Sequence, residues 1–495
     1  MLFNSLEFLV FLPVTFALFW LFPNRFRWIP ALAASYYFYM YWNPKLVFLI
    51  LFTTAVSYVC GIMLEKYNEK PKVKKLIVAI TLTACLGVLL FFKYFNFLYD
   101  TIFDVIRAFG GNGPAGYFSI MLPVGISFYT FQTASYVIDI YRGKVKAERH
   151  LGYFALFVTF FPQLVAGPIE RPGDLLPQLR AEKNIRKLDY VGAFRFMLVG
   201  FFKKIAVADA IGVIVNATYE NVAAANGLSA LISTLLFAVQ IYCDFSGYSD
   251  IAVGCAKLFG VQLSENFHTP YAATSIKEFW NRWHRSLSGW LRDYIYFPLG
   301  GSRVKIGRWV FNIFTVFFIS GLWHGASYNF VIWGLLHAVF QVIGKFTLSP
   351  RNKFWEKLGQ SPDGKLVTYL RRVGNFALVT FAWIFFRADT PKDAISIIGK
   401  VFTDYSFSSA YLVESISKTS LTLTIAIYIV FALVMLLFME KLKYPRELGD
   451  TERKKKVLNS SLRFSAYLAM IWCVVAVWVV LQAADVGSSF IYFQF

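Results

Sequence analysis

The residue best placed to do chemistry in this sequence is His324. It stands in the string Gly-Leu-Trp-His-Gly-Ala-Ser-Tyr-Asn at positions 321–329, between long apolar runs. An ionisable side chain at membrane depth is costly to keep there, and such residues are usually functional. Imidazole also takes up and gives off protons near neutral pH. We therefore expect His324 to act in proton transfer.

A second stretch, residues 240–301, interrupts the apolar pattern with polar and aromatic residues. Within it, Trp280, Trp283 and Leu287 recur at steps of three and four residues, with Trp290 beyond them. A helix with an aromatic face and a cationic face suits a membrane interface better than a spanning position. We therefore expect an amphipathic interfacial helix here, with most of its tryptophans at headgroup depth.

Arginines follow another face of this segment, at Arg282, Arg285 and Arg292. Arginine pairs bidentately with phosphate, so this face suits an anionic donor, and anchoring to anionic lipid is the alternative. Upstream, Asp244 and Asp250 are expected to pair with these arginines. Metal sites recruit several carboxylates, or His and Cys at characteristic spacings, and the sequence shows neither. We predict no metal site.

A third stretch, residues 158–172, also breaks the apolar pattern. Pro162, Gly167 and Pro168 are incompatible with a straight helix. Non-helical backbone at membrane depth must be buried in protein or line a cavity. The pattern predicts a re-entrant segment.

The composition gives the setting for these residues. Of 495 residues, 57% are apolar and only 16% are charged, whereas a soluble globule averages about 25% charged residues. The formal charge of +20 comes from short basic clusters between apolar runs, which indicates membrane topology and not nucleic-acid binding. We expect an all-α polytopic membrane protein with about 11–12 transmembrane helices. The apolar runs lie at 5–22, 29–42, 45–64, 76–97, 119–139, 189–216, 227–245, 308–322, 328–345, 369–387, 420–438 and 461–483.

Lysine and arginine also indicate the orientation. Basic residues gather in one set of loops and are nearly absent from the alternate set. Because basic loops stay cytoplasmic, both termini are expected to be extracytoplasmic. A miscounted span is the alternative, and the first span reads as retained, not as a signal peptide. The basic loops are 65–75, 141–150, 345–372 and 441–456, and the others are 98–118, 217–226 and 484–495.

Three blocks of this sequence, at 240–250, 266–301 and 320–333, resemble the signature of the membrane-bound O-acyltransferase family. The similarity is greatest to its bacterial branch of alginate O-acetyltransferase subunits and related cell-surface enzymes. It implies a single integral-membrane domain over 1–495 with a core at about 119–345. Re-entrant and interfacial helices would surround a central funnel that opens to the cytoplasm.

The resemblance also assigns site residues. His324 matches the catalytic histidine of the family, and His284 matches an upstream partner position. Transfer from a thioester to a hydroxyl needs a base and a group that stabilises the oxyanion. His324 would be the base, whereas the ranking of the other candidates stays open. Substrate or donor contacts are expected from Trp323, Asn329, Ser286, Arg282, Arg285 and Arg292.

The resemblance implies a membrane acetyltransferase of the bacterial inner membrane. It would pass acetyl from a cytoplasmic thioester, expected to be acetyl-CoA, to an exported, alginate-like polysaccharide, with no permanently bound cofactor. Expected partners are an extracytoplasmic SGNH-type acetyltransferase or similar acceptor protein, the polysaccharide synthesis and export machinery, and membrane lipid, but not nucleic acid. The alternatives are peptidoglycan acetylation, D-alanylation-type transfer, and a transporter or channel.

The aromatic tail at 490–495 resembles the carboxyl-terminal motif of a small partner peptide in teichoic-acid D-alanylation. In that peptide the last residue is a tyrosine that resembles an acyl relay, whereas here it is Phe495. Tyr492 carries the only hydroxyl of the hexapeptide. Tyr492 is therefore a candidate acyl carrier, and an aromatic plug or docking element is the alternative.

Overall fold

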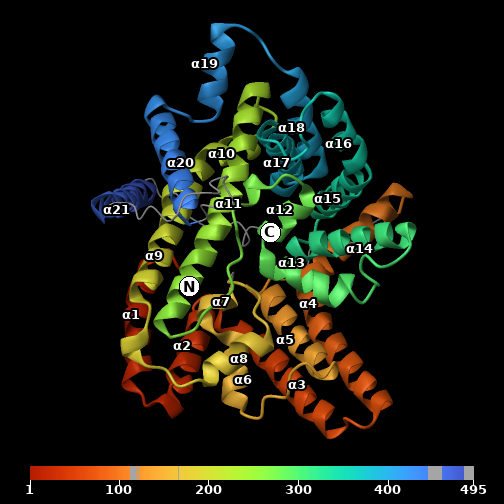
Figure 1. Ribbon diagram of the computed structural model, residues 1–495, viewed down its shortest axis with the longest axis vertical. Helices are drawn as coiled ribbons and strands as arrows, with labels where there is room; N and C mark the ends of the chain where they lie inside the picture. The colour runs from red at the N-terminus through yellow and green to blue at the C-terminus, as the bar shows by residue number, and fades with distance from the viewer. Residues whose placement is uncertain (112–119, 121, 166, 444–459, 484–495) are drawn as a thin grey trace. The chain divides into compact units, whose positions relative to one another are not determined.

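The computed structural model describes residues 1–111, 120, 122–165, 167–443 and 460–483 (Figure 1). Helices are the only regular elements among these residues, which confirms an all-α membrane protein. Within the described part, seven helices are long and apolar enough to cross a membrane, and Leu6–Leu21 is a shorter apolar helix. The count of 11–12 stays a prediction. The seven are Pro44–Lys66, Pro71–Ala108, Gly227–Leu258, Ile306–His324, Tyr328–Phe346, Leu423–Glu440 and Phe464–Ala483.

The chain forms two compact units, which are described separately below. The first contains Met1–Met197 with Tyr248–Ser264, and the second contains Leu198–Gly247 with Glu265–Phe495. The single domain over 1–495 stays a prediction. The first unit holds α1 (Leu6–Leu21), η1 (Asn24–Phe26), α2 (Trp28–Met40), η2 (Pro44–Leu46), α3 (Val47–Lys66), α4 (Pro71–Ala108), α5 (Ile126–Tyr141), α6 (Leu151–Thr159), α7 (Phe161–Leu164), α8 (Pro172–Arg180), η3 (Ile185–Lys187) and most of α9 (Tyr190–Phe201).

In the first unit α3, α4 and α5 pack side by side, and α6 packs against α2 and α8 (Figure 1). Helix α4 begins with Pro71 at its first turn, where a missing N–H does no harm. It continues to Ala108, so the prediction that its apolar run ends in a loop from residue 98 was wrong. Apolar residues such as Ile102, Phe103 and Ile106 continue through this stretch, so the helix can continue as well, and Asp104 and Arg107 pair one turn apart on it.

The stretch at 158–172 is a broken helix, as predicted. Helix α7 is separated from α6 by Phe160. Residues 165 and 167–171, which lead to α8, are not helical, and residue 166 is not described. The carbonyl of Phe157 accepts hydrogen bonds from Gln132 Nε2 at 2.6 Å and Gln163 Nε2 at 2.8 Å. The described backbone here is largely buried in protein, and its re-entrant course stays a prediction.

The second unit contains the helices that carry residues 276–291 and 321–329. Helix α15 packs against α14 and α17 (Figure 1). Helices α20 and α21 both contact the π-helix η4. The unit holds η4 (Phe202–Asp209), α10 (Ala210–Tyr219), the start of α11 (Gly227–Leu258), η5 (Pro270–Ala272), α12 (Ile276–Arg282), α13 (Arg285–Leu291), η6 (Arg292–Tyr296), α14 (Ile306–His324), α15 (Tyr328–Phe346), α16 (Leu348–Lys357), α17 (Lys365–Arg387), α18 (Pro391–Thr403), α19 (Ser409–Lys418), α20 (Leu423–Lys443) and α21 (Ser460–Ala483).

One prediction for residues 240–301 was wrong. Helix α11 runs unbroken through the polar residues at 240–250, whose side chains are buried in the protein. The expected interfacial helix, however, is two short helices that break at Trp283 and His284. Its tryptophans Trp280, Trp283 and Trp290 are buried in the protein and do not lie at an exposed interface.

Candidate active site

Helices α14 and α15 form a hairpin joined by residues 325–327, and His324 is the last residue of its first arm. Glycines make the two arms touch. A Cβ at Gly321 would collide with the backbone of Phe330, and one at Gly334 would collide with the backbone of Phe317. Small residues that let helix backbones meet are typical of membrane helix pairs. The glycines therefore fix the position of His324 at the end of the crossing.

The imidazole of His324 lies in an aromatic enclosure. Only 4% of the residue is exposed. Its ring centroid is 4.8 Å from that of Trp333 and 5.4 Å from that of Phe386, both edge-on. Gly325 follows because a Cβ there would collide with the ring of Phe330. The Trp-His-Gly string is thus dictated by packing as well as by chemistry.

His284 occupies the break between α12 and α13 and is completely buried. Its backbone is left-handed, with φ 40° and ψ 56°, which costs a non-glycine residue about 1 kcal/mol. Asn266 holds this turn: its carbonyl accepts from Arg285 N at 2.9 Å, and its Oδ1 accepts from Ser286 N at 3.2 Å. Packing and hydrogen bonds thus maintain a strained backbone at a candidate catalytic residue.

The indole of Trp323 contacts both histidines. Its ring centroid is 5.6 Å from that of His284 and 5.0 Å from that of His324. Phe245 of α11 packs edge-on against His284 from another direction, at 4.6 Å. The three residues that the sequence placed at 284, 323 and 324 are therefore brought together, although 39 positions separate Trp323 from His284 in the chain.

Burial sets the protonation of His284. Removal from water lowers the pKa of this imidazole to about 3. The ring is therefore neutral at physiological pH, and it can act as a hydrogen-bonding partner but not as a cation. This suits a residue that orients a substrate or a neighbouring group.

The arginines differ from one another in their partners. Arg282 donates to Glu278 Oε1 from Nε at 3.1 Å and from Nη2 at 2.9 Å. Arg292 pairs with Asp293 at 2.8 Å. Arg285 has an exposed side chain. Acidic partners thus already engage Arg282 and Arg292, and Arg285 and Arg292 are both exposed whereas Arg282 is half-buried.

Asn329 and His337 are buried, and each makes a hydrogen bond that joins two helices. Asn329 Nδ2 donates to the carbonyl of Ala388 at 2.5 Å and so ties the start of α15 to the end of α17. His337 is completely buried and accepts from Trp280 Nε1 at 3.3 Å. His337 is therefore a packed, hydrogen-bonded group.

A buried charge network on η4 was not predicted from the sequence. Lys204 Nζ lies 2.8 Å from Asp209 Oδ1 and 2.6 Å from Asp244 Oδ1. The expectation for Asp244 had named only arginines as partners. Lys203 Nζ lies 3.1 Å from Glu440 Oε1. The signal in the sequence was two adjacent lysines inside the apolar run at 189–216, where such residues are rare unless paired.

The π-helical register of η4 frees a backbone carbonyl. The carbonyl of Ala206 accepts from the hydroxyl of Tyr428 at 2.6 Å, which satisfies a group left over by the wider turn. Gly247 of α11 lies directly against this helix. π-Helical turns occur frequently at functional sites, and this one carries both buried lysines. The remaining candidate, Tyr492, lies outside the described residues.

Comparison with known proteins yields one family and several relatives. The family model of membrane-bound O-acyltransferases matches residues 147–362. A protein named probable alginate O-acetylase from Pseudomonas aeruginosa is 35% identical over 463 residues, covering 93% of this chain and 85% of the relative. One of the same name from Pseudomonas putida is 33% identical over the whole of both chains. A peptidoglycan O-acetyltransferase of Helicobacter pylori is 32% identical and covers 80% of this chain and 79% of its own.

Proposed function

We propose, from the premise that this chain belongs to the membrane-bound O-acyltransferase family, that it acetylates an exported polysaccharide of the alginate type. The observation that carries the proposal is the contact of one buried indole with two imidazoles, within a chain similar over its whole length to alginate O-acetylases. The acyl donor in this proposal is acetyl-CoA on the cytoplasmic side.

The proposed reaction uses His324 as the general base. Its imidazole takes the proton of an acceptor hydroxyl while the hydroxyl oxygen attacks the thioester carbonyl. The tetrahedral oxyanion then collapses, the carbon–sulfur bond breaks, and the departing thiolate takes the proton from the imidazolium. His284, neutral and held in place by Asn266, would position the reacting groups through hydrogen bonding. Their aromatic surroundings exclude water, which protects the thioester from hydrolysis.

The donor and acceptor sides of the proposal rest on different residues. Arg285 and Arg292, in an exposed cationic segment, would meet the donor phosphates, and Arg282, held by Glu278, would shape that segment. The protein would lie in the bacterial inner membrane with both termini outside. An extracytoplasmic SGNH-type acetyltransferase would receive the acetyl group, together with the polysaccharide export machinery. The tail at 490–495 is proposed to plug the outer opening or to dock the extracytoplasmic partner, with Tyr492 as a transient acyl carrier the alternative. Full activity of Tyr492→Phe would eliminate the carrier role.

Turnover of isotope-labelled acetyl-CoA by the purified protein tests the proposal. His324→Ala should lower the transfer rate by about 10²–10⁴-fold, the usual contribution of a general base. His150→Ala is the matched control, because His150 is exposed and lies in the first unit. Normal turnover by His324→Ala would refute the assignment.

The acceptor is tested separately in cells. Loss of acetyl from an alginate-like polysaccharide on deletion of the gene supports the proposal. Loss of acetyl from peptidoglycan alone would instead favour the alternative that the Helicobacter pylori relative represents. Transport of a solute without acetyl-CoA turnover would favour a transporter.

A further inference from the structure

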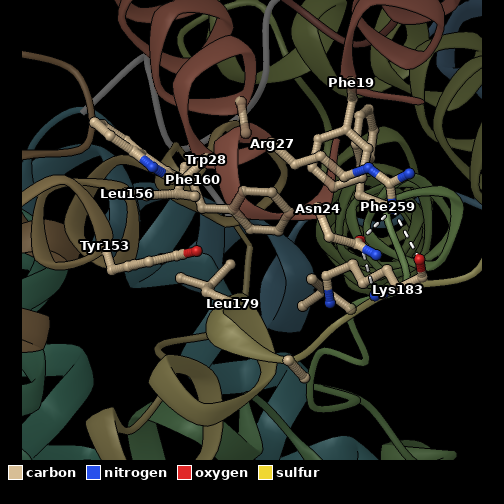
Figure 2. A pocket seen from close by; sticks show the side chains of 13 residues that line it. Phe19, Asn24, Arg27, Trp28, Tyr153, Leu156, Phe160, Leu179, Lys183 and Phe259 are labelled. Atoms are coloured by element: carbon tan, nitrogen blue, oxygen red, sulfur yellow. Dashed lines mark hydrogen bonds between the residues drawn. The ribbon is translucent and has the colours of Figure 1, made fainter. Parts of the chain in front are cut away.

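The first unit contains a hollow. None of the candidate site residues lines it. It is lined by residues of α1, α2, α6, α8 and their neighbouring segments, together with Phe259 and Val261 after α11 (Figure 2). Its polar side chains, Asn24, Arg27 and Lys183, gather at one end beside the rings of Phe19 and Phe259, and the other end is formed by Trp28, Tyr153, Leu156 and Phe160 (Figure 2). The hollow is small, which suits a single compact polar group.

The two cations at this hollow have no acidic partner. Neither Arg27 nor Lys183 makes an ion pair within the part of the chain that the structure describes. They are held instead by neutral groups: Arg27 Nη1 donates to the carbonyl of Lys183 at 2.8 Å, and Lys183 Nζ donates to the carbonyls of Gln178 at 2.7 Å and Gly260 at 2.9 Å. Two positive charges are thus brought together without compensation.

The charges affect each other. Burial, and then the positive charge of Arg27, lower the pKa of Lys183 to about 8. An anion between the two side chains would remove this repulsion and restore the full charge of the lysine. Both side chains are only partly buried, and two neighbouring cations without an acidic partner among the described residues would stabilise an anion placed between them.

Arg27 and Lys183 also have N–H groups that make no hydrogen bond within the described residues. Arg27 uses Nε and Nη1, towards Phe22, Asn24 and Lys183, whereas its Nη2 makes no hydrogen bond within the described residues. Lys183 uses two of the three N–H groups on Nζ. The unused donors of Arg27 and Lys183 match the several acceptor oxygens of a phosphate group.

We propose that this hollow is a binding site for a phosphate group, with Arg27 and Lys183 as its cationic ligands. The phosphate comes either from the headgroup of an anionic phospholipid or from a small soluble phosphate. The aromatic side chains Trp28 and Phe160 line the opposite end and would contact the apolar part of a lipid. This site is separate from the acetyl-transfer chemistry.

Native mass spectrometry of the detergent-purified chain tests the lipid source. Phosphatidylglycerol is offered against phosphatidylcholine, whose choline cation opposes the two side chains. The wild type should retain phosphatidylglycerol preferentially, and Lys183→Met should lower that retention at least about tenfold, as expected for loss of one charge-assisted contact. Lys183→Arg, which keeps the charge, should rescue it. Arg25→Gln is the matched control, because Arg25 is exposed and lies two residues from Arg27.

Inorganic phosphate tests the soluble source. If it raises the melting temperature of the wild type but not of Lys183→Met, and no lipid preference is seen, the site binds soluble phosphate. The proposal is overturned if neither probe distinguishes wild type from Lys183→Met, or if Arg25→Gln has the same effect.

Discussion

Replacement of Gly247 by alanine tests how closely α11 must approach η4. A Cβ at this position would lie 2.7 Å from Gly200 O, 2.9 Å from Lys204 N and 3.1 Å from Lys203 Cβ. The first two are backbone atoms, so no side-chain rotation can relieve the overlap. Helix α11 must therefore move away from η4 if alanine is to fit.

The size of the movement follows from these distances. Ordinary contact begins at 3.4 Å, and the shortest distance is 2.7 Å, so the helices must separate by about 0.7 Å. Overpacking of this kind costs about 1–3 kcal/mol, and the higher helix propensity of alanine returns up to about 1 kcal/mol. We therefore expect a net loss of about 1–2 kcal/mol in stability. Because Phe245, two residues earlier, contacts His284, activity should also fall at least about tenfold.

Thermal unfolding in detergent and acetyl-CoA turnover measure the two effects. Gly289→Ala is the matched control, since Gly289 lies on α13 near His284 and a Cβ there meets nothing within 4 Å. That variant should be neutral or slightly stabilised. If Gly247→Ala and Gly289→Ala behave alike in both assays, close packing of α11 on η4 does not position His284.

Three further predictions concern buried groups. Lys204→Met should lower stability by about 3–5 kcal/mol, because the carboxylates of Asp209 and Asp244 lose their cation. Adding Asp209→Asn and Asp244→Asn should restore most of the lost stability. Unchanged stability of Lys204→Met would contradict this. His284→Gly should be about 1 kcal/mol more stable than His284→Ala, since only glycine adopts the left-handed backbone without strain, and equal melting temperatures would argue against it. Burial raises the pKa of Glu170 to about 7, so between about pH 4.5 and 7 the folded state binds more protons than the unfolded state. Stability should therefore fall as pH rises through this range. Glu170→Gln should flatten the dependence of stability on pH, and an unchanged dependence would refute the role of Glu170.

The sequence predicted those features that depend on residue type and local pattern. His324 between apolar runs, the break at Pro162 and Gly167, and the all-helical class each follow from a chemical restriction that acts on neighbouring residues. The family resemblance added His284. The structure shows that His284 and His324 are buried and that the helix is broken near Pro162. Catalysis by either histidine stays a prediction.

The features that sequence reasoning missed depend on residues far apart in the chain. Periodic tryptophans are compatible with either an interfacial helix or a buried one, and only the surrounding helices decide that Trp283 is buried. The break at His284 is held by Asn266, eighteen positions earlier, and periodicity carries no information about it. Likewise, Lys203 pairs with Glu440 from the other end of the unit, a pairing that no local pattern indicates.

The hairpin of α14 and α15 also bears on how the protein is made. Its arms are joined by three residues, and its contacts are local in sequence, so it can form as soon as both arms have left the ribosome. Two apolar helices of 19 residues with so short a turn would enter the bilayer together as one insertion unit. Trp333 can therefore enclose His324 early in biogenesis, whereas Phe386 of α17, later in the chain, can join only after further synthesis. Ribosome-bound chains that stop before α17 should thus already contain the hairpin but not the complete enclosure of His324.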